Sequence, residues 1–343
     1  MYVRKRTYLA IKEHILEEID CEEFNKVAEN CRNIVDNGIS YAYGYSQFWI
    51  RKDNKERIFD RKTANKLIQQ KVKLRPIKAP KELLKQDCKA INDELSKFVE
   101  NKEEITGFVK NKDVILNAEL HQKNGAKYGV NLDLENAFNQ ITYRNIKEFG
   151  RYVLGWNKRT SAKFARMMTH KGVMVQGNPL SPTLLNLFCL ELDSLMKSYC
   201  KGNSMYYTRY ADDICITSRN PISNLHLNLI LNIIQYSKMN VNNKKTKFYK
   251  NLIEITGVRI RGKNYIKTCN RKKLKMDVRA LQGLLNNKGY LWLDRKAKDG
   301  SPISIEMVVR GCNNWIFRQH SETMKKRNFR MKAEEIIEKL IRA

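Results

Sequence analysis

Apolar residues recur at helical spacing in two stretches of the first hundred positions. Ile11, Ile15 and Ile19 follow one another at intervals of four, and apolar residues repeat in a similar way over 83–95. Because residues three and four apart share one face of a helix, both stretches predict amphipathic helices. Between them, the segment 74–80 carries two prolines, which oppose helix and favour an extended chain. We therefore expect a mainly helical N-terminal part with an extended insertion.

The pattern changes between residues 125 and 260, where short apolar runs alternate with amphipathic segments. The run at 128–133 ends in an aspartate and is typical of a buried strand. Residues 206–217 predict two further strands that meet at Ala211-Asp212. Such an alternation predicts a mixed centre of helices and short strands.

In the second strand of this hairpin, apolar residues occupy consecutive positions. Side chains along a strand point alternately to opposite faces. Ile214 and Ile216 are therefore expected on one face of the sheet, and Cys215 on the other. Further along the chain, Ser181-Pro182 suits the N-cap and first turn of a helix, whose apolar face would extend from Leu184 to Leu192.

Together these elements predict an α+β protein in three parts. The parts are an N-terminal helical segment (1–70), a mixed central core (71–260) and a basic helical C-terminal part (261–343). The 343 residues allow roughly two or three domains. Hydrophobic residues make up 42% of the chain, which is enough for a buried core and argues against disorder.

Charge gives the first indication of function. Lys and Arg number 65 against 36 Asp and Glu, so the net charge is +29. From Arg259 onwards the chain has 22 basic and 8 acidic residues, and this last quarter therefore carries a net +14. A solvated basic face explains a few such charges. A bias this large favours a surface that grips a nucleic-acid backbone.

Other classes of protein are disfavoured. No apolar run approaches the ~20 residues of a membrane span, and no apolar stretch of a signal peptide follows the basic N-terminus. The eight cysteines form no CxxC pair and do not accompany the histidines, so zinc has little support. We expect a cytoplasmic protein without a membrane partner.

Three aspartates in the central part of the chain indicate a metal-binding site. Asp212 and Asp213 are adjacent at the tip of the hairpin, and two neighbouring carboxylates flanked by apolar strands are costly to keep ionised without a cation. Asp133, at the end of a neighbouring strand, would complete a site for two Mg²⁺ ions ~4 Å apart. The alternative for Asp212-Asp213 is an ordinary aspartate-rich turn.

Three motifs decide between these alternatives. Tyr-Ala-Asp-Asp at 210–213, Asn-Leu-Asp-Leu-Glu-Asn-Ala-Phe at 131–138 and Gln-Gly-Asn-Pro-Leu-Ser-Pro at 176–182 resemble, in order and spacing, the motifs of reverse transcriptases. The resemblance implies a right-hand polymerase fold, with fingers and an antiparallel palm over 71–260 and a helical thumb after it. It also implies an RNA-directed DNA polymerase that uses two Mg²⁺ ions and deoxynucleoside triphosphates.

The resemblance assigns roles to individual residues. Asp133, Asp212 and Asp213 would be catalytic, and with the main chain of Leu134 they would bind the metals. Nucleotide and template would be bound by a second set, namely Arg75, Lys78, Phe138, Gln176, Gly177 and Lys245. Phe138 corresponds to the aromatic residue that excludes a 2′-hydroxyl. Primer or RNA would be bound by a third set, namely Tyr210, Thr256, Gly257, Asn117 and His121.

Asn-Ala-Glu-Leu-His at 117–121 and Ile-Thr-Gly at 255–257 resemble signatures of the retron group, as does the stretch 310–315. That likeness implies a cognate structured noncoding RNA that supplies template and priming 2′-hydroxyl. The product would be DNA joined to RNA, used in anti-phage defence with a separate effector protein, and a host ribonuclease H would remove template. On a helix Asn117 and His121 share a face, and a buried hydrogen-bonded pair is the alternative to RNA contact.

Two positions depart from the resemblance, because Asn178 and Asn139 stand where other residues are usual in the family. Neither departure removes a catalytic group. The other interpretations are a group II intron-like or abortive-infection-type bacterial reverse transcriptase, a DNA-templated polymerase, and a non-catalytic RNA-binding scaffold. The presence of all three aspartates argues against the scaffold.

Overall fold

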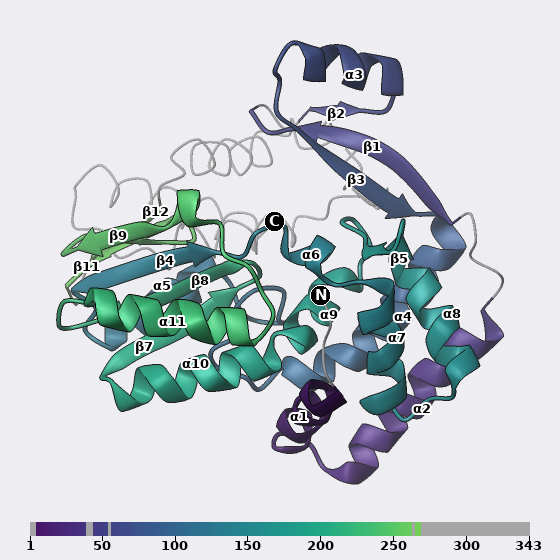
Figure 1. Cartoon of the computed structure of the whole chain (residues 1–343), viewed down its shortest axis with the longest axis horizontal. Coiled ribbons are helices and arrows are strands. Elements are labelled where there is room, and N and C mark those ends of the chain that lie inside the picture. The colour runs from purple at the N-terminus through teal and green to yellow at the C-terminus, as the bar shows by residue number, and fades with distance from the viewer. Residues whose placement is uncertain (1–4, 39–43, 54–55, 263–264, 269–343) are drawn as a thin grey trace, which may run out of the picture.

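The computed structural model describes residues 5–38, 44–53, 56–262 and 265–268. Figure 1 shows a region built around a sheet, a region of packed helices beside it, and a hairpin that projects from the helices. Within the described residues, no helix is long and apolar enough to cross a membrane. The stretch 310–315 and most of the basic C-terminal part lie outside the described residues.

The sheet of the first region has four antiparallel strands in the order β7-β8-β4-β9. Their bounds are β4 (Tyr128–Asp133), β7 (Met205–Tyr210), β8 (Asp213–Ser218) and β9 (Lys247–Lys250). Strands β7 and β8 form the predicted hairpin. Because the hairpin pairs with β4 in register, the ends of β4 and β8 lie side by side, with Asp133 opposite Asp213.

Both faces of this sheet are covered. Helices α10 (Leu190–Gly202) and α11 (Asn224–Tyr236) lie over one face. The other face packs against α5 (Val114–Lys123) and a small sheet of β10 (Ile253–Ile255), β11 (Val258–Arg261) and β12 (Tyr265–Thr268). Ile214 and Ile216 belong to the larger core and Cys215 to the smaller one, which confirms the predicted alternation.

The second region consists of helices that share the larger core. Their bounds are α1 (Lys5–Leu16), α2 (Cys21–Asn37), α4 (Glu82–Leu95), α7 (Tyr143–Tyr152), α8 (Lys158–Met168) and α9 (Ser181–Phe188). Ile11 and Ile15 are fully buried in α1, as their spacing predicted. Ile19 lies beyond the end of α1, because the Asp20 side chain caps the next helix by accepting a hydrogen bond from the Glu23 N–H.

The projecting hairpin pairs β1 (Tyr45–Arg51) with β3 (Leu74–Pro80), and the short β2 (Arg57–Ile58) and α3 (Arg61–Gln69) lie between them in the chain. The extended conformation predicted for 74–80 is confirmed. The helical segment predicted for 1–70 is partly wrong, since it also contains β1. The pairing of β1 with β3 joins residues on both sides of the predicted boundary at 70 and 71.

The start of α9 corrects a prediction. Leu180, and not Ser181, is the residue that precedes the first turn, with Pro182 early in the helix. The Ser181 side chain is fully buried, and its hydroxyl donates a hydrogen bond of 2.8 Å to the carbonyl oxygen of Val175. The hydroxyl therefore fastens the preceding loop to the helix. The apolar face predicted up to Leu192 is divided between α9 and α10.

The remaining short elements connect these regions. They are the 3-10 turns at Ser96–Val99 and Asn243–Lys245, helix α6 (Ala137–Gln140), and the small hairpin of β5 (Thr169–His170) and β6 (Val173–Met174). Helix α6 follows directly on β4, and the β5–β6 hairpin contacts α6. The end of β4 is thereby placed beside the loop that leads into α9.

Candidate active site

The three predicted aspartates gather where β4 ends and β8 begins. Asp133 is paired with Asp213, and strand alternation places both side chains on the same face of the sheet. Asp212 occupies the turn between β7 and β8, and its carbonyl oxygen accepts a hydrogen bond of 2.8 Å from the Leu134 N–H. The end of β4 and the hairpin turn are therefore held together by the main chain.

The turn itself has an unfavourable backbone. Only Ala211 and Asp212 separate the two strands. Ala211 has a φ of +60°, a left-handed conformation that usually requires glycine, and it is 5% exposed. A non-glycine residue held in this way costs about 1–3 kcal/mol, so the surroundings of the turn must stabilise it.

The carboxylates disfavour one another's charge. Loss of hydration and then the negative charges of Asp212 and Asp133 raise the pKa of Asp213 to about 6. Loss of hydration is also the main reason why the pKa of Asp212 is raised. Lys245 offsets part of this charge, because its Nζ lies 2.6 Å from Asp133 Oδ1, and this bond raises the pKa of the lysine.

The chemistry of these groups fits Mg²⁺, which prefers oxygen ligands. Carboxylates whose ionisation is opposed by their neighbours gain from a nearby cation, and the amine of Lys245 already takes such a position. Within the described part of the chain, no three His, Cys, Asp or Glu side chains converge into a complete metal site. Other oxygens, such as the Leu134 carbonyl and nucleotide phosphates, would have to supply the remaining ligands, as is usual for this ion.

A groove of about 410 Å³ opens beside Asp133 and Asp212. It brings together side chains from β3, α6, the loop before α9 and the turn before β9. Among the predicted residues it is lined by Arg75, Lys78, Asp133, Phe138, Gln176, Asp212 and Lys245. Predicted residues as far apart in the chain as Arg75 and Lys245 thus share one groove.

One wall of this groove is positively charged. Lys78 is half-buried, and loss of hydration, with the charge of Lys171, lowers its pKa. Arg75 is exposed on the same strand, and Lys52 and Lys171 also line the groove. Carboxylates and cationic side chains therefore line the same groove, an arrangement that suits a triphosphate bound with a divalent cation. Lys171 was not predicted, since a lysine in a short turn carries no signal of its own.

Gly177 fixes the position of the loop against β3. Its φ is +108°, and a Cβ at this position would lie 2.7 Å from the carbonyl oxygen of Lys78. The Lys78 N–H also donates a hydrogen bond of 2.9 Å to the carbonyl oxygen of Gln176. Only glycine permits this close approach, and Gln176 is thereby held at the edge of the groove.

The turn between β10 and β11 lines a second cavity, of about 290 Å³, on the other side of Asp133. Thr256 and Gly257 line this cavity together with Asp213 and Asn131. Asn131 Oδ1 is buried and has no hydrogen-bond partner among the described residues. It was not predicted, although it stands two positions before Asp133 and therefore on the same face of β4.

Tyr210 does not line either of these two cavities. Its ring instead packs against Phe108, with ring centroids 6.3 Å apart. The structure therefore does not bring Tyr210 together with Thr256 and Gly257, the other residues that were predicted to bind primer.

The prediction that Asn117 and His121 contact RNA is wrong for this structure, because both side chains are fully buried. His121 makes hydrogen bonds of 2.7 Å with both the Thr208 and the Thr217 hydroxyl groups. The Thr208 hydroxyl in turn donates a hydrogen bond of 2.6 Å to Asn117 Oδ1. Asn117 and His121 therefore belong to a buried hydrogen-bonded cluster, which was the alternative to RNA contact. This cluster connects α5 to the β7–β8 hairpin.

The same cluster extends to the second cavity. Asn117 Nδ2 donates a hydrogen bond of 3.4 Å to the hydroxyl oxygen of Thr256. Burial without a charged partner lowers the pKa of His121 to about 3, so its imidazole is neutral. The pair thus connects the strand that precedes the aspartates to the turn that lies opposite them.

Comparison with known proteins adds to this geometry. Residues 52–260 match the family described as reverse transcriptase (RNA-dependent DNA polymerase). The chain is 32% identical over 142 residues to the retron Ec86 reverse transcriptase of Escherichia coli, which covers 41% of this chain and 43% of that protein. It is 28% identical over 183 residues to the retron Ec83 reverse transcriptase of the same organism, over 49% and 58% of the two chains. The chain spans about half the length of these curated relatives.

Among solved structures, telomerase from Candida albicans in complex with a fragment of telomeric RNA is similar with a TM-score of 0.42 and 14% identity. The likeness covers 78% of this chain and 55% of that one.

Proposed function

The chain belongs to the reverse transcriptase family, the RNA-dependent DNA polymerases, and from this premise we propose that it copies RNA into DNA. The observation that carries the proposal is the pairing of Asp133 with Asp213, with Asp212 in the turn beside them, at a groove that cationic side chains also line. A catalytic polymerase needs acidic metal ligands and phosphate-binding groups in one site.

The residues of the groove divide the work. Asp133, Asp212 and Asp213, with the Leu134 carbonyl, would hold two Mg²⁺ ions. When bound, such ions activate the attacking hydroxyl group and stabilise the leaving pyrophosphate. Arg75 suits bidentate contact with phosphate, and Lys78 supplies a further positive charge.

Nucleotide and template would be positioned by neighbouring groups of the same groove. Gln176, which Gly177 holds against β3, would contact the template base pair. Lys245 would approach the triphosphate after leaving Asp133. Thr256 and Gly257, which line the second cavity with Asp213, would support the primer strand. The basic part 261–343 would serve as thumb and RNA grip.

At a finer level, we propose that the enzyme is of the retron type. It would reverse-transcribe part of its own structured noncoding RNA from a 2′-hydroxyl of that RNA, and the product would be a branched RNA–DNA molecule. Support comes from the similarity to the two retron enzymes of Escherichia coli. A separate effector protein, host ribonuclease H and a role in anti-phage defence belong to the same proposal.

A primer-extension assay tests the polymerase. Purified protein, deoxynucleoside triphosphates and Mg²⁺ are supplied with one primer annealed to an RNA template or to a DNA template of the same sequence. We expect templated extension on RNA and a loss of extension when chelator removes the cation. Absence of extension on RNA, while extension on DNA proceeds, would contradict the proposal.

Phe138→Val is expected to relax the choice of sugar. The ring of Phe138 lines the groove with Asp212 and Gln176, and a smaller side chain leaves space for a 2′-hydroxyl. We expect incorporation of ribonucleotides relative to deoxyribonucleotides to rise by about 10- to 100-fold. Competition between the two nucleotide types in the primer-extension assay measures this ratio.

Phe188→Val serves as the matched control, since Phe188 is 7% exposed in the larger core and lies outside the groove. It is expected to lower stability and to leave the sugar preference unchanged. Equal ribonucleotide incorporation by wild type and Phe138→Val would remove Phe138 from the nucleotide site.

A further inference from the structure

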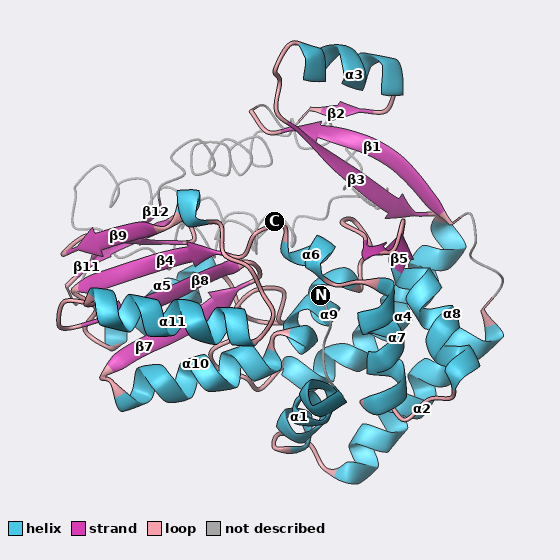
Figure 2. Cartoon of the chain, viewed as in Figure 1, coloured by secondary structure: helices cyan, strands magenta, loops and turns pink. Residues whose placement is uncertain are grey.

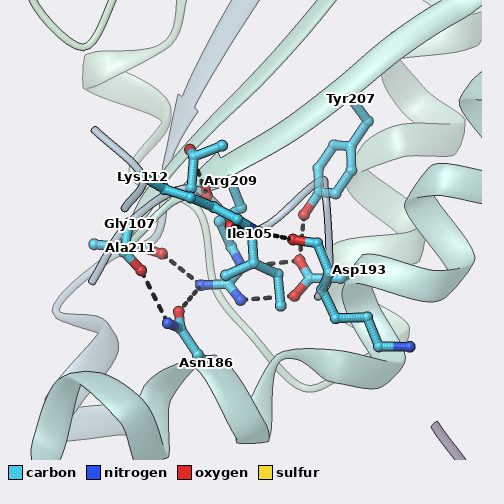
Figure 3. A network of polar contacts seen from close by, with 10 residues as sticks. Ile105, Gly107, Lys112, Asn186, Asp193, Tyr207, Arg209 and Ala211 are labelled. Atoms are coloured by element: carbon cyan, nitrogen blue, oxygen red, sulfur yellow. Dashed lines mark hydrogen bonds and ion pairs between the residues drawn. The ribbon is translucent and has the colours of Figure 1, made fainter. Parts of the chain in front are cut away.

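A charged side chain lies fully buried directly behind the catalytic turn. Arg209 is 0% exposed, although it stands only two positions before Ala211 in β7. Its Nε and Nη2 donate to the two carboxylate oxygens of Asp193 in α10, at 2.8 and 2.6 Å. Asp193 is itself 1% exposed and accepts a further hydrogen bond of 2.5 Å from the Tyr207 hydroxyl. Figure 3 shows the Arg209 side chain between Asp193 and Tyr207 on one side and Ala211 and Asn186 on the other.

The third nitrogen of the guanidinium reaches the turn. Arg209 Nη1 donates one hydrogen bond of 3.0 Å to the carbonyl oxygen of Ala211 and another of 2.9 Å to Asn186 Oδ1. All three guanidinium nitrogens are thereby engaged, and only an arginine offers donors in this fixed, planar arrangement. A lysine at the same position could not contact Asp193 at two points and also reach Ala211.

These contacts fix both carbonyls that flank the backbone of Asp212. The carbonyl before it, of Ala211, is held by Arg209, and its own carbonyl is held by the Leu134 N–H at 2.8 Å. Because both peptide planes are held, the direction in which the Asp212 side chain leaves the backbone is also set. The left-handed conformation of Ala211 persists because the turn is tied down at these two points.

The segment before α5 supports the turn from a third side. A Cβ at Gly107 would lie 2.4 Å from the Ala211 nitrogen and 2.8 Å from the Tyr210 carbonyl carbon. Asn186 Nδ2 donates a hydrogen bond of 2.9 Å to the Gly107 carbonyl oxygen. The Asn186 side chain, which also contacts Arg209, therefore holds this segment in place. The glycine is required because the segment touches the turn with its backbone.

Stability alone does not explain a buried ion pair at this place. Removing two charges from water offsets most of their attraction, and well-packed apolar residues often serve a core equally well. What apolar residues cannot supply is a hydrogen bond to the Ala211 carbonyl oxygen. The cluster therefore provides something specific to the turn.

We propose that Arg209, held by Asp193 and Asn186 and opposed by Gly107, positions the catalytic turn so that Asp212 and Asp213 can bind metal. Arg209 is a positioning residue, since it touches neither substrate nor metal. The inference rests on the proposed function in that the aspartates are taken as metal ligands. The test therefore measures metal binding separately from DNA synthesis.

The test uses Arg209→Lys and Gly107→Ala in the full-length chain. The first keeps the positive charge but loses the contacts of the guanidinium, and the second presses on the Ala211 nitrogen without changing the ion pair. Binding of Mn²⁺ is followed by the electron paramagnetic resonance signal of the free ion, and Asp212→Asn identifies the site. Trp156→Phe is the control, because it loses a buried hydrogen bond of 2.9 Å to the Ala28 carbonyl oxygen, far from the turn.

We expect Mn²⁺ affinity at the Asp212-dependent site to fall by about 10- to 100-fold in both variants, as for other residues that orient metal ligands. Trp156→Phe should bind with the wild-type affinity. Simple destabilisation lowers the number of binding sites and not the affinity of each, so wild-type affinity in the folded fraction of Arg209→Lys and Gly107→Ala would overturn the proposal. If Arg209→Lys does not fold, Gly107→Ala decides.

The two proposals fail separately. A wild-type protein that binds Mn²⁺ through Asp212 but makes no DNA on an RNA template would refute the polymerase. In that case weaker binding by Arg209→Lys would still support the positioning role.

Discussion

Asp212→Asn is expected to abolish DNA synthesis while the fold persists. The substitution keeps the size of the side chain and removes the negative charge that a metal ion needs. The loss of one such group in a preorganised site lowers kcat by about a thousandfold or more. Because loss of hydration raises the pKa of Asp212, its charged form opposes folding at neutral pH, and the neutral amide should leave the melting temperature unchanged or higher.

Asp87→Asn is the matched control for this experiment. Asp87 lies in α4, outside the groove, and loss of hydration also raises its pKa. Both variants make the same chemical change, so only the position differs. Primer extension and thermal unfolding are measured on both. Full-length product from Asp212→Asn, at a rate close to that of Asp87→Asn, would refute the assignment of the metal site.

His121→Leu is expected to destabilise the protein strongly without removing any group from the groove. The imidazole is fully buried and makes hydrogen bonds with two threonine hydroxyls. The Thr208 hydroxyl also donates to Asn117, whereas that of Thr217 makes no other hydrogen bond within the described residues. A buried hydroxyl left without a partner costs about 1–3 kcal/mol, and the lost contacts add to this. We expect the free energy of unfolding, measured with urea, to fall by about 2–4 kcal/mol.

The same histidine should make stability depend on pH. Its pKa is about 3 in the folded protein and near 6.5 in the unfolded chain, so the unfolded chain takes up the proton first. The stabilisation is complete above about pH 6.5 and is lost as the pH falls towards 3. The expected slope from this residue is about 1.4 kcal/mol per pH unit within that window.

His121→Gln isolates this contribution, because glutamine keeps hydrogen-bonding groups and does not titrate. The difference in unfolding free energy between wild type and this variant is measured at several values between pH 7 and 4.5. A difference that shrinks steadily with falling pH agrees with a buried neutral imidazole. A constant difference would mean that His121 can become protonated in the folded protein.

The β7–β8 hairpin could be predicted from the sequence because its determinants are local. The side chains of consecutive apolar residues in β8 point alternately to its two faces, and the charged pair Asp212-Asp213 stands between two strand-like runs, where a turn is expected. The pairing of β4 with β8 then follows from the hydrophobic faces. The family resemblance inferred from these motifs is confirmed by the match over residues 52–260.

The surroundings of the site were harder to predict. Spacing places Asn117 and His121 on one face of α5, but it does not say whether that face meets solvent or sheet. Their partners Thr208 and Thr217 lie about 90 positions further along the chain and are ordinary strand residues. Only the packing of α5 against the hairpin decides the matter.

Arg209 illustrates the same difficulty. An arginine next to a catalytic turn suggests contact with phosphate, and nothing in the local pattern indicates that Asp193, on a helix 16 positions earlier, removes it from solvent. Strand alternation fixes the face on which the side chain lies, and the helix that covers this face carries the acid. The buried pair therefore became visible only in the fold.

The nucleic acid that co-purifies with the protein from its native host tests the central proposal most directly. The material is treated with ribonuclease, then with a debranching enzyme, and is separated on a denaturing gel beside material from Asp212→Asn cells. The proposal predicts a discrete DNA in the wild type that shifts on debranching and is absent from the variant. Heterogeneous DNA, DNA without a shift, or equal DNA in both samples would contradict a reverse transcriptase primed from a 2′-hydroxyl of its own RNA.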